Sequence, residues 1–258
     1  MERTKLYFAS DFHLGIPDYA SSLKRERMLV SWLTQVAVDA SEIFLMGDIF
    51  DFWFEYKTVV PKGFVRLLGK LAEITDAGIV VHVFRGNHDV WAFDYLAKEI
   101  NIQLHREPVV RTIGGRTFFL AHGDGLGPGD HGYKFLKKVF EFKPNQFLFR
   151  WLHPDIGTRM GLYFSGRSRL ANLAKAGTLE NEPDQQKGVL LDFALNQLQQ
   201  NESINYFIFG HRHVPVLESI GDHTQLVILG DWITHFTYAV FHEGTMQLLR
   251  YPQGTTVD

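Results

Sequence analysis

Residues 6–13 read Leu-Tyr-Phe-Ala-Ser-Asp-Phe-His, so a short apolar run leads directly into Asp11 and His13. An apolar run of this length that ends in polar residues is typical of a buried strand. Two similar apolar runs follow at residues 43–46 and 79–84. Before each of them, at residues 29–36 and 64–71, apolar residues have the helical i, i+3, i+4, i+7 spacing. The strand–helix–strand–helix–strand order predicts an α/β protein with a parallel sheet, whose functional loops lie at the carboxyl ends of its strands.

The second half of the chain is rich in strand patterns. Gly114-Gly115 lies between two β-rich runs and predicts a hairpin turn. Apolar residues at helical spacing over residues 191–198 predict one more helix. Further strands are predicted at residues 206–209, 214–220, 226–229, 236–241 and 246–251. We therefore predict two sheets flanked by helices.

The composition excludes several classes of protein. A length of 258 residues with 45% hydrophobic residues predicts one domain with a sizeable core. The formal net charge of -3 argues against a nucleic-acid-binding protein. With 0 cysteines, a bound metal must use His, Asp, Glu or Asn, a donor set that suits Mn, Fe, Zn or Mg. No apolar run approaches the roughly 18 residues that cross a bilayer, and we expect a cytoplasmic location.

Residues 131–175 differ from the rest of the chain. They carry nine basic residues against two acidic ones, Glu141 and Asp155, together with nine aromatic residues. This gives the segment a formal charge of +7 and leaves -10 for the remainder of the chain. Prolines and glycines divide it into short pieces. We interpret the segment as an insertion between two loops that carry chemistry.

Five polar clusters follow predicted strands. They are Asp11-Phe12-His13, Gly47-Asp48-Ile49-Phe50-Asp51, Gly86-Asn87-His88-Asp89, His122-Gly123-Asp124 and Gly210-His211-Arg212-His213. In extended chain, residues i and i+2 project to the same side, so the paired ligands of the first and last clusters can each reach one centre. Glycines in these clusters allow sharp turns and a close approach to a bound ion. Each cluster alone is typical of an ordinary loop, but five in order along one chain predict a metal site.

The order Asp-x-His, Gly-Asp-x-x-Asp, Gly-Asn-His-Asp, His-Gly-Asp, Gly-His-x-His resembles the calcineurin-like metallophosphoesterase superfamily. The match spans nearly the whole chain outside the insertion. It implies a four-layer α/β/β/α sandwich in which one aspartate bridges two divalent metal ions. The resemblance assigns Asp11, His13 and His213 to the first metal, Asn87, His122 and His211 to the second, and the bridge to Asp48.

The same resemblance assigns the roles next to the metals. His88 would be the general acid or the group that stabilises the transition state, while Asp51, Asp89 and Asp124 would orient the ligands. Two divalent ions roughly 3.5–4 Å apart repel each other strongly, so an anionic ligand such as Asp48 is needed between them. A phosphate-ester transition state spreads charge over its equatorial oxygens, and His88 can donate a hydrogen bond or proton to it.

Two further stretches, Gly47 to Trp53 and Leu229-Gly230-Asp231-Trp232, resemble the branch that contains the UDP-2,3-diacylglucosamine pyrophosphatases. That resemblance implies hydrolysis of a diphosphate in a lipid-linked nucleotide sugar during lipid A biosynthesis, with two divalent metals, Mn²⁺ first among them. It also implies contact with the inner surface of the inner membrane. The best-known members carry Arg where His88 stands here. The expected organisation is a single domain over residues 1–258, with residues 126–180 as a helical, basic and aromatic lid.

The lid has its own expected chemistry. Aromatic residues can line a channel for acyl chains, while Arg and Lys can bind a diphosphate. Ser165, Arg167 and Arg169 are the candidates for phosphate contacts. The alternative is a compact lid whose aromatics form its own core. A soluble phosphatase or nucleotide phosphodiesterase therefore remains an alternative function, whereas the complete ligand set argues against a non-catalytic scaffold.

Overall fold

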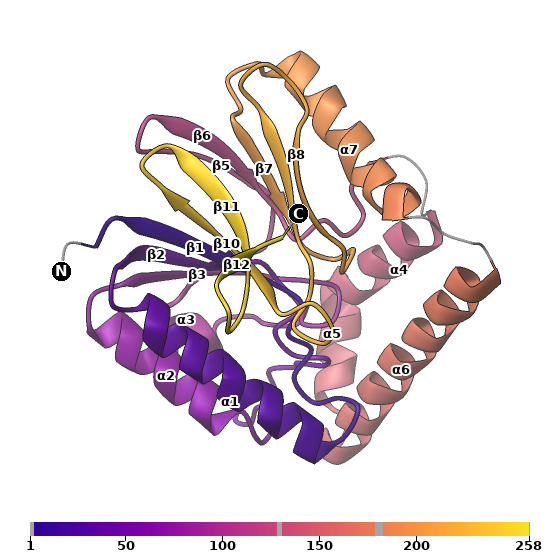
Figure 1. Cartoon of the computed structure of the whole chain (residues 1–258). Helices are drawn as coiled ribbons and strands as arrows, with labels where there is room; N and C mark the ends of the chain where they lie inside the picture. Colours follow the sequence, from indigo (N-terminus) through magenta and orange to yellow (C-terminus); the bar gives the residue numbers. More distant parts are fainter. Residues whose placement is uncertain (1–2, 128–130, 179–182, 258) are drawn as a thin grey trace.

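The computed structural model describes the backbone of residues 3–127, 131–178 and 183–257, and the side chains of residues 3–127, 131–166 and 188–257. Two mixed β-sheets pack against each other, and helices cover their outer faces (Figure 1). Within the described chain, no helix combines the length and apolarity that a bilayer-spanning segment needs.

The first sheet has seven strands in the order β12-β11-β10-β1-β2-β3-β4. Strands β1 to β4 run parallel, and β10, β11 and β12 add to β1 in antiparallel fashion. The bounds are β1 (Lys5–Ala9), β2 (Ala40–Leu45), β3 (Val80–Phe84), β4 (Gln103–His105), β10 (Thr237–His242), β11 (Thr245–Arg250) and β12 (Thr255–Thr256). The predicted parallel β-α-β-α-β order is confirmed.

The second sheet has five strands in the order β5-β6-β7-β9-β8, of which β6, β7 and β9 run parallel. The bounds are β5 (Val109–Ile113), β6 (Arg116–Leu120), β7 (Tyr206–Phe209), β8 (Pro215–Ser219) and β9 (Gln225–Leu229). Ile113 pairs with Arg116, so the predicted hairpin turn at Gly114-Gly115 is confirmed. Both glycines have positive φ, 56° and 75°, as the favoured two-residue hairpin turn requires.

Helices α1 (Tyr19–Val36), α2 (Val65–Asp76) and α3 (Tyr95–Ile100) pack on the first sheet, and α7 (Pro183–Gln200) packs on the second. Alternate residues of the strands therefore enter different cores. Leu6 and Phe8 belong to the core between the sheets, while Tyr7 belongs to the core shared with α1 and α2. Phe118 likewise faces the first sheet and Phe119 faces α7. Three cores separate four layers, which confirms the predicted α/β/β/α sandwich.

Three short elements were not predicted: β4, β12 and α3. They contain three, two and six residues. The spacing of apolar residues identifies a helix or strand only over several residues, and these three elements are too short to show such a pattern. β4 pairs with β3, so its formation depends on the neighbouring strand more than on its own sequence.

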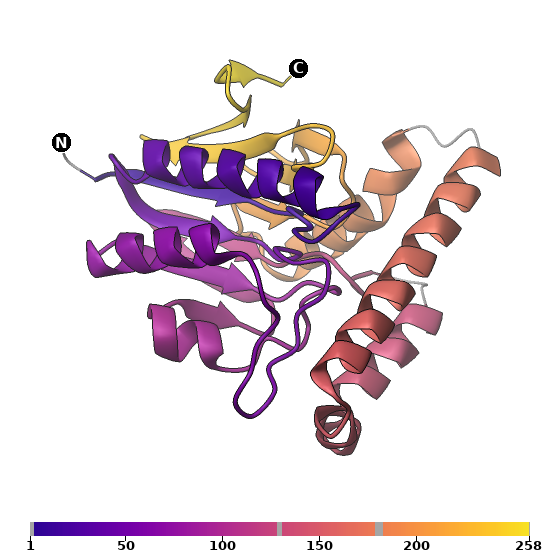
Figure 2. The ribbon, with the colours of Figure 1, turned by 90° about the horizontal axis from the view of Figure 1, so that it is seen from below.

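Helices α4 (His131–Glu141), α5 (Lys143–Arg150) and α6 (Pro154–Thr178) stand beside the sandwich. Figures 1 and 2 both show them next to the end of the sandwich toward which the parallel strands run, with α6 as a long helix on the outside. The segment interpreted as an insertion is therefore helical and lies at the end of the sandwich where functional loops are expected.

Candidate active site

The candidate ligands come from both sheets. Asp11 and His13 follow β1, and Asp48 and Asn87 follow β2 and β3 of the same sheet. The histidines of the second sheet, His122, His211 and His213, follow β6 and β7. Because the carboxyl ends of both sets of parallel strands meet at one end of the sandwich, side chains far apart in sequence converge there.

The first group contains Asp11, His13 and His213, whose ligand atoms all lie within 4.8 Å of one another. The Nε2 atoms of His13 and His213 are 3.1 Å apart, and His213 Nε2 lies 3.2 Å from Asp11 Oδ1. Asp11 and His13 are almost completely buried. A carboxylate and two imidazole nitrogens that point at one another are a suitable ligand set for a divalent cation.

The second group contains Asp48, His122 and His211, again with ligand atoms within 4.8 Å of one another. His122 Nε2 lies 3.4 Å from Asp48 Oδ2 and 3.3 Å from Asn87 Oδ1. The structure therefore brings all seven predicted ligands close together. His13, Asp51 and His88 form a third group of ligand atoms within 4.8 Å of one another.

Asp48 lies between the two groups. Its Oδ2 atom is 3.7 Å from His13 Nε2 and 3.4 Å from His122 Nε2. Its Oδ1 atom accepts a hydrogen bond of 2.9 Å from the backbone N–H of His88. With Oδ1 bonded to the protein, Oδ2 is the oxygen that faces both groups. This arrangement fits a carboxylate that bridges two cations.

Three of the histidines have an acceptor behind Nδ1. His122 Nδ1 lies 2.8 Å from the carbonyl of Met46, which can only accept, so Nδ1 carries the proton. His213 Nδ1 lies 3.3 Å from Asp231 Oδ2, and His13 Nδ1 lies 3.4 Å from Asp51 Oδ1. In each ring Nε2 is thereby left to face the ligand group, which is how metal-binding histidines are oriented in proteins.

Sequence reasoning did not assign a role to Asp231. The signal was available, because Gly230-Asp231-Trp232 follows a predicted strand. One oxygen of Asp231 faces His213, and the other accepts hydrogen bonds from the N–H groups of three residues, Ile233, Thr234 and His235. Asp231 is thus fixed by the following turn and holds the His213 ring in place.

The ligands are held in an uncommon backbone conformation. Asp11, His13, Asp48, His211 and His213 all have positive φ, between 43° and 68°. Non-glycine residues avoid this region, at a cost of order 1–3 kcal/mol each, and such residues cluster at functional sites. The surrounding packing must offset this strain, which local sequence patterns do not reveal.

Glycines allow the ligand loops to approach one another. A Cβ atom at Gly86 would overlap the Asp48 carboxylate, and one at Gly47 would overlap the His122 ring. Gly47 also has φ of 97°, which confirms the predicted sharp turn there. Because Gly86 and Gly47 have no side chain, the Asp48 carboxylate and the His122 ring can occupy the space beside them.

The electrostatics of the site favour positive charge. Burial alone would raise the pKa of Asp48, but the charges available on His122 and His88 outweigh it and hold the pKa well below its usual range. Burial likewise opposes the charged form of His213, yet Asp11 outweighs it and raises the pKa of His213 to about 10. Burial lowers the pKa of His211 to about 4. A cation that replaces protons among these residues is therefore well matched to the donors present.

Two of the aspartates predicted to orient the ligands contact backbone or insertion instead of ligand side chains. Asp89 accepts hydrogen bonds from the N–H groups of Gly86 and Ile49, at 2.7 and 2.8 Å, and so ties the β3 loop to the β2 loop. Asp124 accepts from Tyr133 Oη at 2.6 Å and from Lys137 Nζ at 2.8 Å, both on α4. It thus anchors α4 next to His122.

His88 lies at the edge of the first group. Its ring packs edge-on against that of His13, with 4.8 Å between the centroids. Its Nδ1 atom is 3.0 Å from the carbonyl oxygen of Asp51, and also 3.0 Å from Ser165 Oγ. Burial lowers the pKa of His88, against the opposing effect of Asp48. Ser165 is therefore next to the site, whereas the side chains of Arg167 and Arg169 lie outside the described residues.

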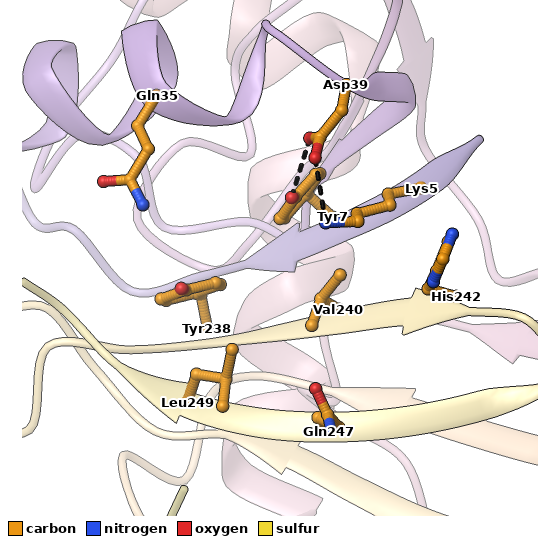
Figure 3. Close-up of a pocket in the computed structure, with 9 residues that line it drawn as sticks. All are labelled: Lys5, Tyr7, Gln35, Asp39, Tyr238, Val240, His242, Gln247 and Leu249. Atoms are coloured by element: carbon orange, nitrogen blue, oxygen red, sulfur yellow. Dashed lines mark hydrogen bonds and ion pairs between the residues drawn. The ribbon is translucent and has the colours of Figure 1, made fainter. Parts of the chain in front are cut away.

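A separate cavity of about 300 Å³ lies on the outer face of the first sheet, beside the end of α1 (Figure 3). Its lining includes an ion pair between Lys5 and Asp39 at 2.8 Å and a hydrogen bond from Tyr7 Oη to Asp39 at 2.9 Å. It lies toward the amino-terminal half of β1 and contains none of the candidate ligands.

The model of the calcineurin-like phosphoesterase family matches residues 4–215, which include all seven candidate ligands. The chain belongs to the calcineurin-like phosphoesterase family. Membership in this family implies a dinuclear site for divalent metals, and the two ligand groups with Asp48 between them fit it.

Relatives of this phosphoesterase extend over nearly its full length. A protein of Porphyromonas gingivalis named UDP-2,3-diacylglucosamine hydrolase is 38% identical over 255 residues, which are 95% of this chain and 97% of the relative. A protein of Aeromonas salmonicida with the same name is 25% identical over 93% of this chain and 91% of its own. Among solved structures, the phosphoesterase Yfce of E. coli has 14% identity and a TM-score of 0.48, and covers 98% of this chain and 97% of its own.

Proposed function

We propose that this phosphoesterase hydrolyses the diphosphate of UDP-2,3-diacylglucosamine, which gives UMP and 2,3-diacylglucosamine 1-phosphate, a step of lipid A biosynthesis. The observation that carries the proposal is the 38% identity to the Porphyromonas gingivalis protein of that name, over 95% of this chain. The alignment extends beyond the ligand loops into the rest of the molecule. The basic and aromatic character of α4–α6 is compatible with a substrate that has both a diphosphate and acyl chains.

We propose that Asp11, His13 and His213 bind one metal, that Asn87, His122 and His211 bind the other, and that Asp48 bridges them. A donor set of imidazole, carboxylate and amide oxygen without thiolate suits Mn²⁺, our first candidate, ahead of Fe, Zn and Mg. When bound, two such cations supply Lewis acidity to the phosphoryl oxygens and lower the pKa of water. Metal analysis of the purified protein identifies the native ion.

His88 is our candidate for the catalytic side chain. The hydrogen on Nδ1 is directed at the Asp51 carbonyl, so Nε2 is the ring atom left to face the reacting phosphate. Nε2 donates to a phosphoryl oxygen or to the leaving group when the ring is protonated on both nitrogens. The peptide N–H of His88 is bonded to Asp48 Oδ1, which fixes the ring beside the bridging carboxylate. His88 would therefore act on the reacting phosphate next to the metals, and hydrogen bonds from the chain set its orientation.

We further propose that residues 126–180 form a lid within a single domain over residues 1–258. The described part of α4–α6 exposes many large apolar side chains, of which Phe135 (69%) and Trp151 (77%) are the most exposed. Basic residues accompany them: Lys134, Lys138, Lys143, Arg150 and Arg159. Apolar side chains beside basic ones are suited to acyl chains and to anionic lipid headgroups. This supports peripheral contact with the cytoplasmic face of the inner membrane.

The test is a comparison of kcat/KM for UDP-2,3-diacylglucosamine, for its deacylated analogue and for simple nucleotides. Each buried CH₂ contributes about 0.8 kcal/mol to binding, so the acylated substrate is expected to exceed the deacylated one by orders of magnitude. Equal values for the two would overturn the lipid assignment in favour of a soluble phosphatase or nucleotide phosphodiesterase. Absence of hydrolysis of any of them by the metal-loaded protein would contradict an enzymatic role altogether.

A further inference from the structure

Ser165 makes a contact between α6 and the ligand loops. Its Oγ atom lies 2.7 Å from Asp51 Oδ2 and 3.0 Å from His88 Nδ1, although 114 and 77 residues separate it from these partners. Most described side chains of α6 are exposed, but Gly157 is buried and Gly161 and Ser165 are partly buried. These three residues are spaced four apart, so they lie on one face of the helix.

The two glycines explain how the α6 backbone comes so close. A Cβ atom at Gly157 would overlap the Tyr56 hydroxyl, and one at Gly161 would overlap the Phe52 ring. The helix therefore lies directly on the loop after β2, without side chains of its own in between. One turn further along the same face, Ser165 reaches Asp51, the neighbour of Phe52 in that loop.

The direction of the hydrogen bonds follows from the chemistry of the partners. An ionised carboxylate can only accept, so the Ser165 hydroxyl donates its hydrogen to Asp51 Oδ2. The Asp51 carbonyl also can only accept, so His88 Nδ1 carries a hydrogen that points toward it. Ser165 Oγ, 3.0 Å from the same nitrogen, is a second acceptor, so the single Nδ1 hydrogen is shared between the two oxygens.

We propose that Ser165 is a positioning residue for His88. By accepting from Nδ1–H and donating to Asp51, it fixes the ring with Nε2 toward the reacting phosphate. Docking of α6 on the loop after β2 and orientation of His88 are then one event, which links the insertion to the chemistry. This inference rests on the proposed catalytic role of His88, and it is independent of which phosphodiester is the substrate.

The test uses the metal-loaded full chain and a small chromogenic phosphodiester. Ser165→Ala is expected to lower kcat roughly 10-fold with little change in KM, because misorientation of a catalytic group affects the reaction more than binding. Ser165→Thr keeps a hydroxyl and is expected to restore most of the rate. Thr158→Val, which removes a hydroxyl two turns away on the same helix, is the matched control and is expected to leave the rate unchanged.

A double-mutant cycle separates positioning from direct substrate contact. In a His88→Ala background, Ser165→Ala is expected to have no further effect, because the ring that it positions is gone. If the rate losses of His88→Ala and Ser165→Ala add in the double mutant, or if Ser165→Ala raises KM and leaves kcat unchanged, Ser165 contacts the substrate and the inference is wrong. If His88→Ala has no effect on the rate, the proposed catalytic role of His88 is wrong, and the role of Ser165 that rests on it is wrong as well.

A spectroscopic measurement gives a readout that does not depend on turnover. ¹⁵N NMR of the histidine rings in the zinc-loaded protein reports which nitrogen of His88 carries the proton. The wild-type protein is expected to show the Nδ1–H form. Ser165→Ala is expected to keep this tautomer, because the Asp51 carbonyl remains, but to shift the Nδ1 resonance, because the contact with Ser165 Oγ is lost. An unchanged Nδ1 resonance in Ser165→Ala would overturn the proposal.

Discussion

The Nε2 atoms of His13 and His213 lie 3.1 Å apart, although 200 residues separate these histidines in the sequence. One follows β1 in the first sheet and the other follows β7 in the second. A ligand group that both sheets share can form only if the sheets pack with the carboxyl ends of their parallel strands at the same end. The geometry of this candidate ligand group therefore depends on how the two sheets pack.

Asp48→Ala is expected to abolish hydrolysis, by at least about 10³-fold. The substitution removes Asp48 Oδ2, a carboxylate oxygen that lies near both His13 and His122, and two cations would then repel each other without a bridge. Rates and metal content per chain are the measurements. Asp222→Ala, at an exposed turn, is the control. Two metals per chain and a normal rate in Asp48→Ala would contradict the bridging role.

His88→Ala is expected to lower the rate by roughly 10²–10⁴-fold while leaving metal content near normal. Although the His88 ring lies within 4.8 Å of His13 and Asp51 ligand atoms, its Nδ1 atom is bonded to Asp51 and Ser165, and the resemblance assigns it to neither metal. The backbone N–H that bonds Asp48 remains in the variant. Steady-state kinetics with metal analysis on the same sample tests both parts. A loss of metal together with the side chain would mean that His88 is a ligand.

Asp231→Asn is expected to weaken metal binding by about 10- to 100-fold, the usual effect of losing the partner behind a metal-binding histidine. The amide oxygen can still accept from the turn at residues 233–235, so the fold should be maintained. Titration with a competing chelator measures the affinity, and thermal unfolding of the metal-free protein checks the fold. Unchanged affinity would show that Asp231 only caps the turn.

Trp151→Ser is expected to reduce binding to anionic lipid vesicles, because the indole is 77% exposed on the segment that carries the basic residues. Co-sedimentation with vesicles that contain phosphatidylglycerol measures the bound fraction. Tyr19→Ser removes an equally exposed aromatic on α1, outside that segment, and is expected to bind like the wild type. Equal binding by the wild type and Trp151→Ser would argue against this surface.

His105 predicts a pH dependence of stability. Burial, with help from His82 and Arg111, lowers the pKa of His105 to about 4 in the folded protein. Because the unfolded value is near 6.5, the unfolded chain binds more protons between these pH values, so the free energy of unfolding falls as the pH drops through this window. The contribution is about 1 kcal/mol, since the side chain is only half-buried and solvent screens it.

His105→Gln is expected to flatten this part of the profile, whatever its effect on stability at neutral pH. Urea unfolding at pH 7 and pH 5 gives the difference in unfolding free energy for each protein. His223→Gln, at an exposed position, is the control and should keep the wild-type difference. An identical pH difference in His105→Gln and wild type would assign the effect to other groups.

The sequence by itself determined the layers and the ligand types. Runs such as residues 6–9 and 43–46 are apolar on both faces, so the strands that they form must be packed against other elements on both sides. Glycines with Asp, Asn and His at the strand ends predicted the position of the functional site. These signals are local, so they can be read without coordinates. For the same reason β4 and α3, which depend on their neighbours, were missed.

Only the tertiary structure decided how these residues act together. The resemblance implied two ligand groups and a bridging Asp48, but the distances among the ligand atoms, the choice of Oδ2 as the oxygen of Asp48 that faces both groups, and the contact of Asp231 with His213 depend on how the two sheets pack. The bond from Ser165 to Asp51 depends on a helix that lies against a loop more than 100 residues away. Hydrogen bonds and metal–ligand bonds need distances near 3 Å and correct direction, and no periodicity in the sequence specifies either.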